Sequence, residues 1–457
     1  MNVMDRLNDA LKPIKGYGEI RFGINKSLIL KLHNGKSEMV NNNDLVGGNV
    51  RILLPNRGWG FAVFNRIEDI DRAIKDATDA SLAIIPDEKI ELAKIEPIVA
   101  EIKISADDDA RNHSLQEKYE LLRKYDELTA DIDSRIGEKI FMFTQEFIDR
   151  YLLTTEGTRL IRHRADCVLR STFRAKDANS VQNAFKSFAT RGSFDELTKK
   201  DDAIIDVARK SAELLDARTV KGNAYTVVLN PGLAGVFIHE AFGHLSESDF
   251  VESNPQAQKM MTLGRKFGPE FLNVFDDGSV VPELRGTINY DDEGVPAERT
   301  SLIRDGVLVG RLHSRQTAGK MGEKPTGNAR AQDFRYAPIV RMTGTAIEKG
   351  PHPAAQIFDG IKEGIYAVDA YGGETELENF SFSAGYGYMI RNGKIAEMVK
   401  DVVLQGNLFE TLANIEQIGD DFKWDSGGGY CGKDGQRAKT SEGSPHIRIK
   451  NVIIAGK

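Results

Sequence analysis

The chain has 457 residues, of which 40% are hydrophobic and 28% are charged, and its formal net charge at pH 7 is −7. This length exceeds one compact core, so we expect two domains, and the ordinary composition excludes extensive disorder. The acidic balance argues against direct binding to nucleic acid, which usually requires a basic patch.

Signals for a membrane or a secretory pathway are missing from the sequence. No apolar stretch is long enough for a signal peptide or a membrane span. The chain has two cysteines, Cys167 and Cys431, which do not make a disulfide framework. We therefore expect a cytoplasmic protein with no membrane partner, in a reducing compartment where a thiol stays free to bind metal.

The first half of the chain mixes strand patterns with helix patterns. Residues 18–33 and 49–64 carry strand-like apolar residues, and Asn34-Gly35 is typical of a tight hairpin turn. Residues 138–173 indicate a β-meander. Apolar residues at helical spacing predict helices over residues 67–84, 114–133 and 201–216.

The character of the sequence changes near Lys221-Gly222-Asn223, where we place a domain boundary. After a predicted strand over residues 225–229, the turn signals Asp305-Gly306 and Asn392-Gly393 indicate β-hairpins, and one helix is expected over residues 353–366. We expect an α+β protein, with an N-terminal mixed α/β domain (1–221) and a β-rich C-terminal domain (222–457) that contains antiparallel hairpins and a buried metal-binding helix.

The candidate chemistry lies on a helix expected to start at Asn230-Pro231. Asn is a favourable N-cap and Pro suits the first helical position. Apolar residues then point in nearly every direction, which is typical of a buried helix. Within it lie His239, Glu240 and His244. A buried carboxylate and buried imidazoles need partners, and a metal ion would supply the missing charge.

The spacing of the two histidines requires a local distortion. The sequence reads H-E-x-x-x-H, not the H-E-x-x-H of familiar zinc peptidases. Residues five apart point about 140° from each other in an ideal helix, so their ligand atoms could not converge. We therefore predict a π-bulge, or unwinding at Gly243, between His239 and His244. The alternative is a regular buried helix with two incidental histidines.

A third ligand is needed, because catalytic zinc sites usually have three protein ligands and water. Cys431 is a candidate, since it lies in a glycine-rich loop, residues 427–436, that could press close to another element. Nearby Lys433 would favour the thiolate. A free thiol in a flexible loop is the alternative for Cys431. Cys167 lies in an alternating strand pattern, which indicates packing.

Several blocks resemble the TldD/PmbA family of metallopeptidases, also called modulators of DNA gyrase, and the TldD type in particular. The blocks, in chain order, are His239–His244 with Glu247 and Asp249-Phe250, Tyr290–Pro296, Pro325–Arg330, Arg341–Thr343 and Cys431–Gln436. Their order and number carry the resemblance, which is strongest after residue 222. The segment Thr326–Arg330 could be a substrate-contacting loop or an ordinary surface turn.

The resemblance implies the roles of the site residues. His239, His244 and Cys431 would bind Zn²⁺, and Glu240 would act as the general base of peptide hydrolysis. It also implies a substrate that is an unfolded protein or a short peptide. A dimer is implied as well, formed with a second copy or with a PmbA-type (TldE) paralogue.

Three other functions remain open at this point. The protein could be a catalytically silent binding partner with a purely structural zinc, which would require four protein ligands. It could be a regulatory interaction protein that acts on DNA or gyrase, although the acidic balance argues against direct DNA contact. A cysteine peptidase that uses Cys431 and one histidine would leave Glu240 without a role.

Overall fold

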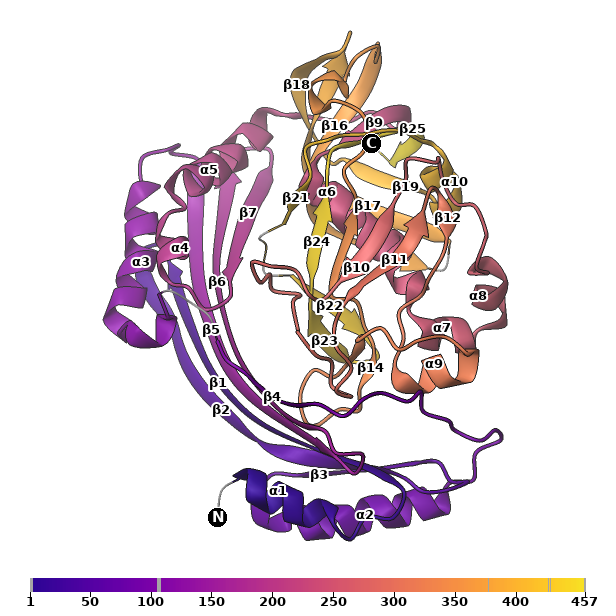
Figure 1. The fold of residues 1–457 in the computed structure, drawn as a ribbon. Helices are drawn as coiled ribbons and strands as arrows, with labels where there is room; N and C mark the ends of the chain where they lie inside the picture. The colour runs from indigo at the N-terminus through magenta and orange to yellow at the C-terminus, as the bar shows by residue number, and fades with distance from the viewer. Residues whose placement is uncertain (1–2, 105–107, 377, 426, 428, 456–457) are drawn as a thin grey trace.

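A computed structural model describes residues 3–104, 108–376, 378–425, 427 and 429–455. One long, curved sheet carries helices on its outer face, and the second half of the chain packs inside its curve (Figure 1). Strands and helices are both abundant, and the second half is rich in strands, so the expected α+β class with a β-rich C-terminal part is confirmed.

The curved sheet has seven described strands, in the order β3-β2-β1-β5-β6-β4, with β7 also paired to β6. All neighbours are antiparallel except β4, which runs parallel to β6. The predicted turn at Asn34-Gly35 joins β1 to β2, and both residues have positive φ. The strands are β1 (Tyr17–His33), β2 (Lys36–Leu53), β3 (Trp59–Phe64), β4 (Val99–Ile102), β5 (Ile136–Thr154), β6 (Arg159–Lys176) and β7 (Val181–Thr190).

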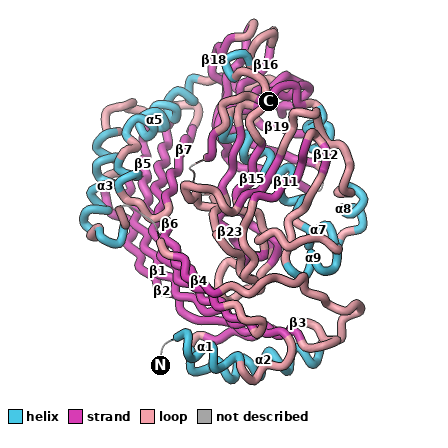
Figure 2. The backbone as a smooth tube through the Cα atoms, viewed as in Figure 1, coloured by secondary structure: helices cyan, strands magenta, loops and turns pink. Residues whose placement is uncertain are grey.

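Two groups of helices cover the outer face of this sheet, as Figure 2 also shows. One apolar cluster joins α1 and α2 to β1, β2 and β3, and a second joins α3, α4 and α5 to β1, β5, β6 and β7. The predicted helices over 67–84, 114–133 and 201–216 are therefore confirmed. The helices are α1 (Val3–Leu11), α2 (Ile70–Ala83), α3 (Leu115–Leu128), α4 (Asp195–Thr198) and α5 (Asp201–Asp216).

The second half of the chain contains an eight-stranded sheet in its described part. Its order is β16-β9-β25-β19-β17-β18-β8, with β20 paired to β25, and a further β16–β17 pairing closes five of the strands into a ring. The strands are β8 (Arg218–Thr219), β9 (Asn223–Leu229), β16 (Glu363–Glu376), β17 (Asn379–Arg391), β18 (Lys394–Lys400), β19 (Val403–Asn407), β20 (Ile415–Ile418) and β25 (Ile447–Ala455).

A six-stranded sheet, β12-β11-β10-β15-β24-β21, lies beside it, together with the small pairs β13–β14 and β22–β23. The strands are β10 (Val274–Asp277), β11 (Arg299–Arg304), β12 (Val307–Leu308), β13 (Ala329–Arg330), β14 (Ile339–Val340), β15 (Gly344–Ile347), β21 (Lys423–Trp424), β22 (Tyr430–Lys433), β23 (Gln436–Lys439) and β24 (Ser441–Ser444). Short helices border the sheets: α7 (Ser248–Ser253), α8 (Pro255–Met260), α9 (Arg315–Met321) and α10 (Leu408–Ala413).

One predicted element is wrong. Residues 353–366 do not form an α-helix; a short 3₁₀ turn (Ala354–Gln356) leads into β16. Gly360 has a positive φ, which ends any helical course, and Ile365 and Ala367 are buried at the strand period of two. The apolar spacing of Ile357 and Ile361 reflects a small cluster with Val228 and Ile390. The hairpins at Asp305-Gly306 and Asn392-Gly393 are confirmed.

The helix that carries the candidate site, α6 (Pro231–Ile238), lies between the eight-stranded and the six-stranded sheet. Its side chains Leu233 and Phe237 belong to one apolar core with residues from both sheets. At Gly235 an added Cβ would come within 3.1 Å of Glu442 Cβ, so α6 packs directly onto β24. This burial fixes the direction in which the chain leaves the end of α6.

Candidate functional site

A π-helical turn separates the two histidines, as predicted. The Asn230 side chain caps α6 by accepting a hydrogen bond from Leu233 N at 2.9 Å. After Ile238 the chain widens into a π-helix, His239–Gly243, in which His244 N–H donates to the carbonyl of His239. That five-residue hydrogen bond places His244 one wide turn after His239. The prediction of a distortion between them is confirmed.

Close packing at Gly243 accompanies the π-turn. A Cβ at this position would lie 2.0 Å from Met342 Sδ, far inside contact distance. The neighbouring Ala241 and Phe242 are fully buried in the core. Glycine therefore lets the turn press against Met342, and a short 3₁₀ turn, His244–Ser246, follows directly.

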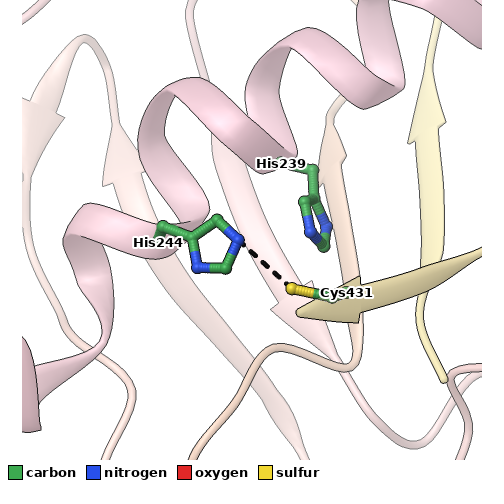
Figure 3. A group of neighbouring side chains, drawn as sticks. All are labelled: His239, His244 and Cys431. Atoms are coloured by element: carbon green, nitrogen blue, oxygen red, sulfur yellow. Dashed lines mark hydrogen bonds between the residues drawn. The ribbon is translucent and has the colours of Figure 1, made fainter. Parts of the chain in front are cut away.

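His239, His244 and Cys431 come together in one cluster. Their nearest ligand atoms all lie within 4.8 Å of one another. His244 Nε2 lies 3.2 Å from Cys431 Sγ, and Figure 3 shows all three side chains converging from the helix and from β22. It is the one such cluster of His, Cys, Asp or Glu found in the described part of the chain.

The donor set and its spacing fit a zinc ion. Zinc binds imidazole nitrogen and cysteine sulfur with bonds of about 2.0–2.3 Å, so ligand atoms of one ion lie about 3.5 Å apart. The 3.2 Å contact and the 4.8 Å limit bracket that spacing. His239 and Cys431 are buried, 3% and 4% exposed, whereas the His244 side chain is 26% exposed.

The charges in the cluster support cation binding. Burial alone would raise the pKa of the Cys431 thiol, but His239 and His244 outweigh burial and lower it to about 5. Burial would lower the pKa of both imidazoles, but the thiolate and nearby carboxylates raise it to about 9 for His239 and about 10 for His244. The thiolate and carboxylates that stabilise the protonated imidazoles also attract a metal cation, which competes with those protons for the same nitrogen atoms.

Two carboxylates, Glu247 and Glu442, lie next to the Nδ1 atoms of the histidines. His244 Nδ1 contacts Glu247 Oε2 at 3.2 Å, and Glu247 is 1% exposed. His239 Nδ1 lies 3.3 Å from Glu442 Oε1, although no acceptor in the described structure is aligned to hydrogen-bond with it. Carboxylates in this position orient histidine ligands and increase their basicity. The sequence offered a signal for Glu247, three residues after His244, but none for Glu442.

Glu247 is held in turn by two cations. Lys433 Nζ lies 3.0 Å from Glu247 Oε2 and 2.6 Å from Asp249 Oδ1. Arg341, which is 1% exposed, donates to the carbonyl of Cys431 at 2.6 Å and places its Nε 3.7 Å from Glu247 Oε1. Lys433 was expected to favour the thiolate. In the structure Lys433 contacts the carboxylates of Glu247 and Asp249, and the two histidines are the main groups that lower the pKa of the thiol.

Glu240 occupies the open side of the cluster. Its side chain is 27% exposed, and Oε2 lies 3.7 Å from His244 Nε2. Among the described residues this carboxylate has no closer ion-pair partner, in contrast to Glu247, which Lys433 and Arg341 hold. Glu240 is thus free to meet a water molecule or a substrate next to the ligand atoms.

The remaining candidates lie outside the cluster. Cys167 is fully buried in β6 within the core beneath α3 and α5, which confirms that it is a packing residue. The segment Thr326–Arg330 is not a surface turn, because Thr326, Asn328 and Arg330 are all buried. In the described part of the chain, no helix has the length and apolar character needed to span a membrane.

Family models match nearly the whole chain. The PmbA/TldA metallopeptidase C-terminal domain matches residues 222–456, the metallopeptidase domain 1 matches residues 18–81, and the central domain matches residues 108–218. Among curated relatives, a metalloprotease of Synechocystis is 44% identical over 96% of this chain and 94% of its own length. A zinc metalloprotease TldD homolog of Saccharolobus solfataricus is 29% identical over 90% of each chain.

Solved structures share the fold. A putative modulator of a DNA gyrase from Thermotoga maritima has a TM-score of 0.80 at 20% identity and covers 99% of each chain. TldE from Thermococcus kodakarensis has a TM-score of 0.79 at 20% identity and covers 100% of each chain.

Proposed function

This chain belongs to the PmbA/TldA metallopeptidase family, and on that premise we propose that it is a zinc-dependent peptidase. In this proposal His239, His244 and Cys431 hold Zn²⁺, and Glu240 is the general base. The observation that carries the proposal is the convergence of the three ligand atoms within 4.8 Å across a π-turn and a distant strand.

Each side chain has a role that follows from its position. Zinc, when bound, supplies Lewis acidity to water and to the scissile carbonyl. The Glu240 carboxylate accepts a proton from the attacking water and returns it to the leaving amine nitrogen. Glu247 and Glu442 keep the imidazoles oriented, and Lys433 and Arg341 keep Glu247 in place.

The accessibility of the cluster supports an unfolded or short peptide as the substrate. Only about a quarter of the Glu240 and His244 side chains is exposed, and the other two ligands are almost fully buried. An extended chain can reach such a recessed site, whereas the surface of a folded domain cannot. The family and relatives' names support peptidase activity, and the substrate class is our inference.

A structural zinc is less well supported by this arrangement. A structural site would have four protein ligands. Glu442, which the structure places beside the cluster, contacts the far nitrogen of His239, and Glu240 has its carboxylate on the open side. Three ligands with an adjacent free carboxylate are typical of a catalytic site.

We further propose a dimer, with a second copy or with a TldE-type paralogue, in the cytoplasm. This chain shares its fold with TldE, which supports a pairing between two chains of similar shape. The division into domains 1–221 and 222–457 is also our proposal, and the C-terminal family model begins at residue 222.

The variant Glu240→Ala tests the proposed function. Zinc-loaded wild-type chain should cleave an unfolded polypeptide, and loss of the base should lower the rate by about 10²- to 10⁴-fold while zinc content stays unchanged. Glu298→Ala, at an exposed loop position, is the matched control and should keep full activity. Cleavage at the wild-type rate by Glu240→Ala would end this assignment.

A further inference from the structure

A cavity lies beside the β22–β23 hairpin, which also carries Cys431 of the metal cluster. It has a volume of about 370 Å³, within the ordinary range for ligand sites. Its walls come from the curved sheet, from the β22–β23 hairpin, which faces this sheet in Figure 1, and from residues 287–292 and 330–335. Tyr430 lines the cavity and the next residue, Cys431, belongs to the metal cluster. Successive side chains of a strand point to opposite faces, so Tyr430 and Cys431 point to opposite faces of the hairpin that the cavity and the metal cluster share.

Positive charge dominates the wall of this cavity. Seven arginines and one lysine line it, against three carboxylates. The whole chain, by contrast, has a net charge of −7. Such a local excess of cations in a concave site focuses an attractive potential for anions.

Part of the positive charge is compensated by nearby carboxylates, of which Asp166 is buried. Arg335 pairs with Asp333 at 2.7 Å. Three further cations share three carboxylates in one network: Arg164, Arg191 and Lys439 with Asp166, Glu146 and Glu283. These groups are neutral as sets and need no further anion.

In the described structure, three positive charges remain without a carboxylate of their own at ion-pair distance. Arg150 and Arg162 share one carboxylate, Asp292. Arg330 donates only to the carbonyls of Met342 and Lys439 and is 8% exposed. The exposed guanidinium of Arg437 has no ion-pair partner in the described structure, where only its backbone N–H is bonded, to Gln332.

The excess of positive charge destabilises the charged form of the buried Arg330 guanidinium. Burial, together with the charges of Arg164 and Arg341, lowers the pKa of Arg330 to about 9. An unpaired buried cation is unfavourable, and an anion at hydrogen-bond distance removes much of that cost. Arginine is also the side chain best suited to bind a carboxylate through two parallel hydrogen bonds.

We propose that this cavity binds the carboxylates of an acidic peptide segment. The identification of that peptide with the substrate rests on the proposed peptidase function, because the cavity and the metal cluster flank one hairpin. An acidic stretch would bind in the cavity while the neighbouring extended residues reach the site beside Cys431. The same oxyanion chemistry could come from free inorganic phosphate, which the test must distinguish.

The test measures binding, so it does not depend on cleavage. The full chain carrying Glu240→Ala is titrated into two dye-labelled, amidated peptides of glycine and serine, one with three central aspartates and one with three asparagines. Fluorescence anisotropy should show about tenfold tighter binding of the aspartate peptide. Adding Arg437→Gln should remove most of this preference. Arg72→Gln, which removes the same charge from an 84% exposed arginine on the outer helix α2, should leave it intact.

Three outcomes would overturn the proposal. The first is equal affinity for the aspartate and asparagine peptides. The second is an aspartate preference that survives Arg437→Gln as fully as Arg72→Gln. The third is binding of inorganic phosphate, measured by calorimetry and lost in Arg437→Gln, with no binding of the aspartate peptide. Acid-selective binding, together with a zinc-loaded wild-type chain that cleaves no peptide, would keep this proposal and remove the proposed function instead.

Discussion

His244 Nε2 lies 3.2 Å from Cys431 Sγ, although 187 positions separate these residues in the chain. The contact exists because the π-turn directs His244 towards β22, where Cys431 pairs with Ala438. The site therefore depends on two features that can be perturbed separately, the shape of the turn and the position of the hairpin.

The fit of Gly243 against Met342 leads to the first prediction. Gly243→Ala should destabilise the fold by about 1–3 kcal/mol, because its Cβ would lie 2.0 Å from Met342 Sδ and the neighbours must shift. Zinc affinity should also fall, because the backbone shift at position 243 would displace His239 and His244 relative to each other. Chemical denaturation and zinc titration measure the two effects. Gly137→Ala is the control, because a Cβ there meets no atom within 4 Å; equal, small effects of both variants would show that the close packing has no importance.

Glu247 should control zinc affinity through His244. Glu247→Gln keeps the shape of the side chain but removes the charge that orients His244 Nδ1, so zinc should bind about 10- to 100-fold more weakly. Competition with a chelating dye measures this change. Glu252→Gln is the control, since Glu252 is also an ion-paired carboxylate nearby, on α7, but contacts Lys320 and no histidine. Unchanged zinc affinity in Glu247→Gln would contradict an orienting role.

Asp292 should make stability depend on pH. Burial alone would raise its pKa, but Arg150 and Arg162 outweigh burial and hold it well below the ordinary 3.8. A lowered folded-state pKa stabilises the fold above pH 3.8, and this contribution is lost as the pH falls towards the folded-state pKa, at about 1.4 kcal/mol per pH unit.

The variant Asp292→Asn isolates that contribution. At pH 7 it should lower the free energy of unfolding by about 3 kcal/mol, because Arg150 and Arg162 lose the negative charge of Asp292, whose side chain is only 4% exposed. Below pH 3.8 the difference from wild type should shrink, as followed by denaturant unfolding. Asp9→Asn, at an exposed pair with Lys12, should change little. A difference that is constant from pH 7 to pH 3 would exclude this linkage.

Local signals in the sequence predicted the elements that carry the site. Asn230-Pro231 marks the start of α6, and the five-residue separation of His239 and His244 is compatible with one ion only if the helix widens, as it does. The failed helix over residues 353–366 shows the limit of the same reasoning. Ile357 and Ile361 have helical spacing, but a positive φ at Gly360 and pairing with β9 decide the structure.

Long-range packing determined what the sequence could not predict. Glu442 lies beside His239 only because α6 packs onto β24 at Gly235, and no short-range pattern encodes that approach. Lys433 lies two positions after Cys431 in the chain, yet its ammonium group contacts the carboxylates of Glu247 and Asp249. The proximity of Cys431 to the histidines likewise came from the family resemblance, and not from spacing.

The central claim is that Cys431 completes a zinc site with His239 and His244. Elemental analysis of the purified chain, after reconstitution with zinc and removal of excess metal, tests it most directly. Wild type should hold about one zinc per chain. Cys431→Ala should hold much less, and Cys167→Ala, which alters a fully buried cysteine far from the cluster, should hold as much as wild type. Zinc retained in full by Cys431→Ala, or absent from wild type, would contradict the account.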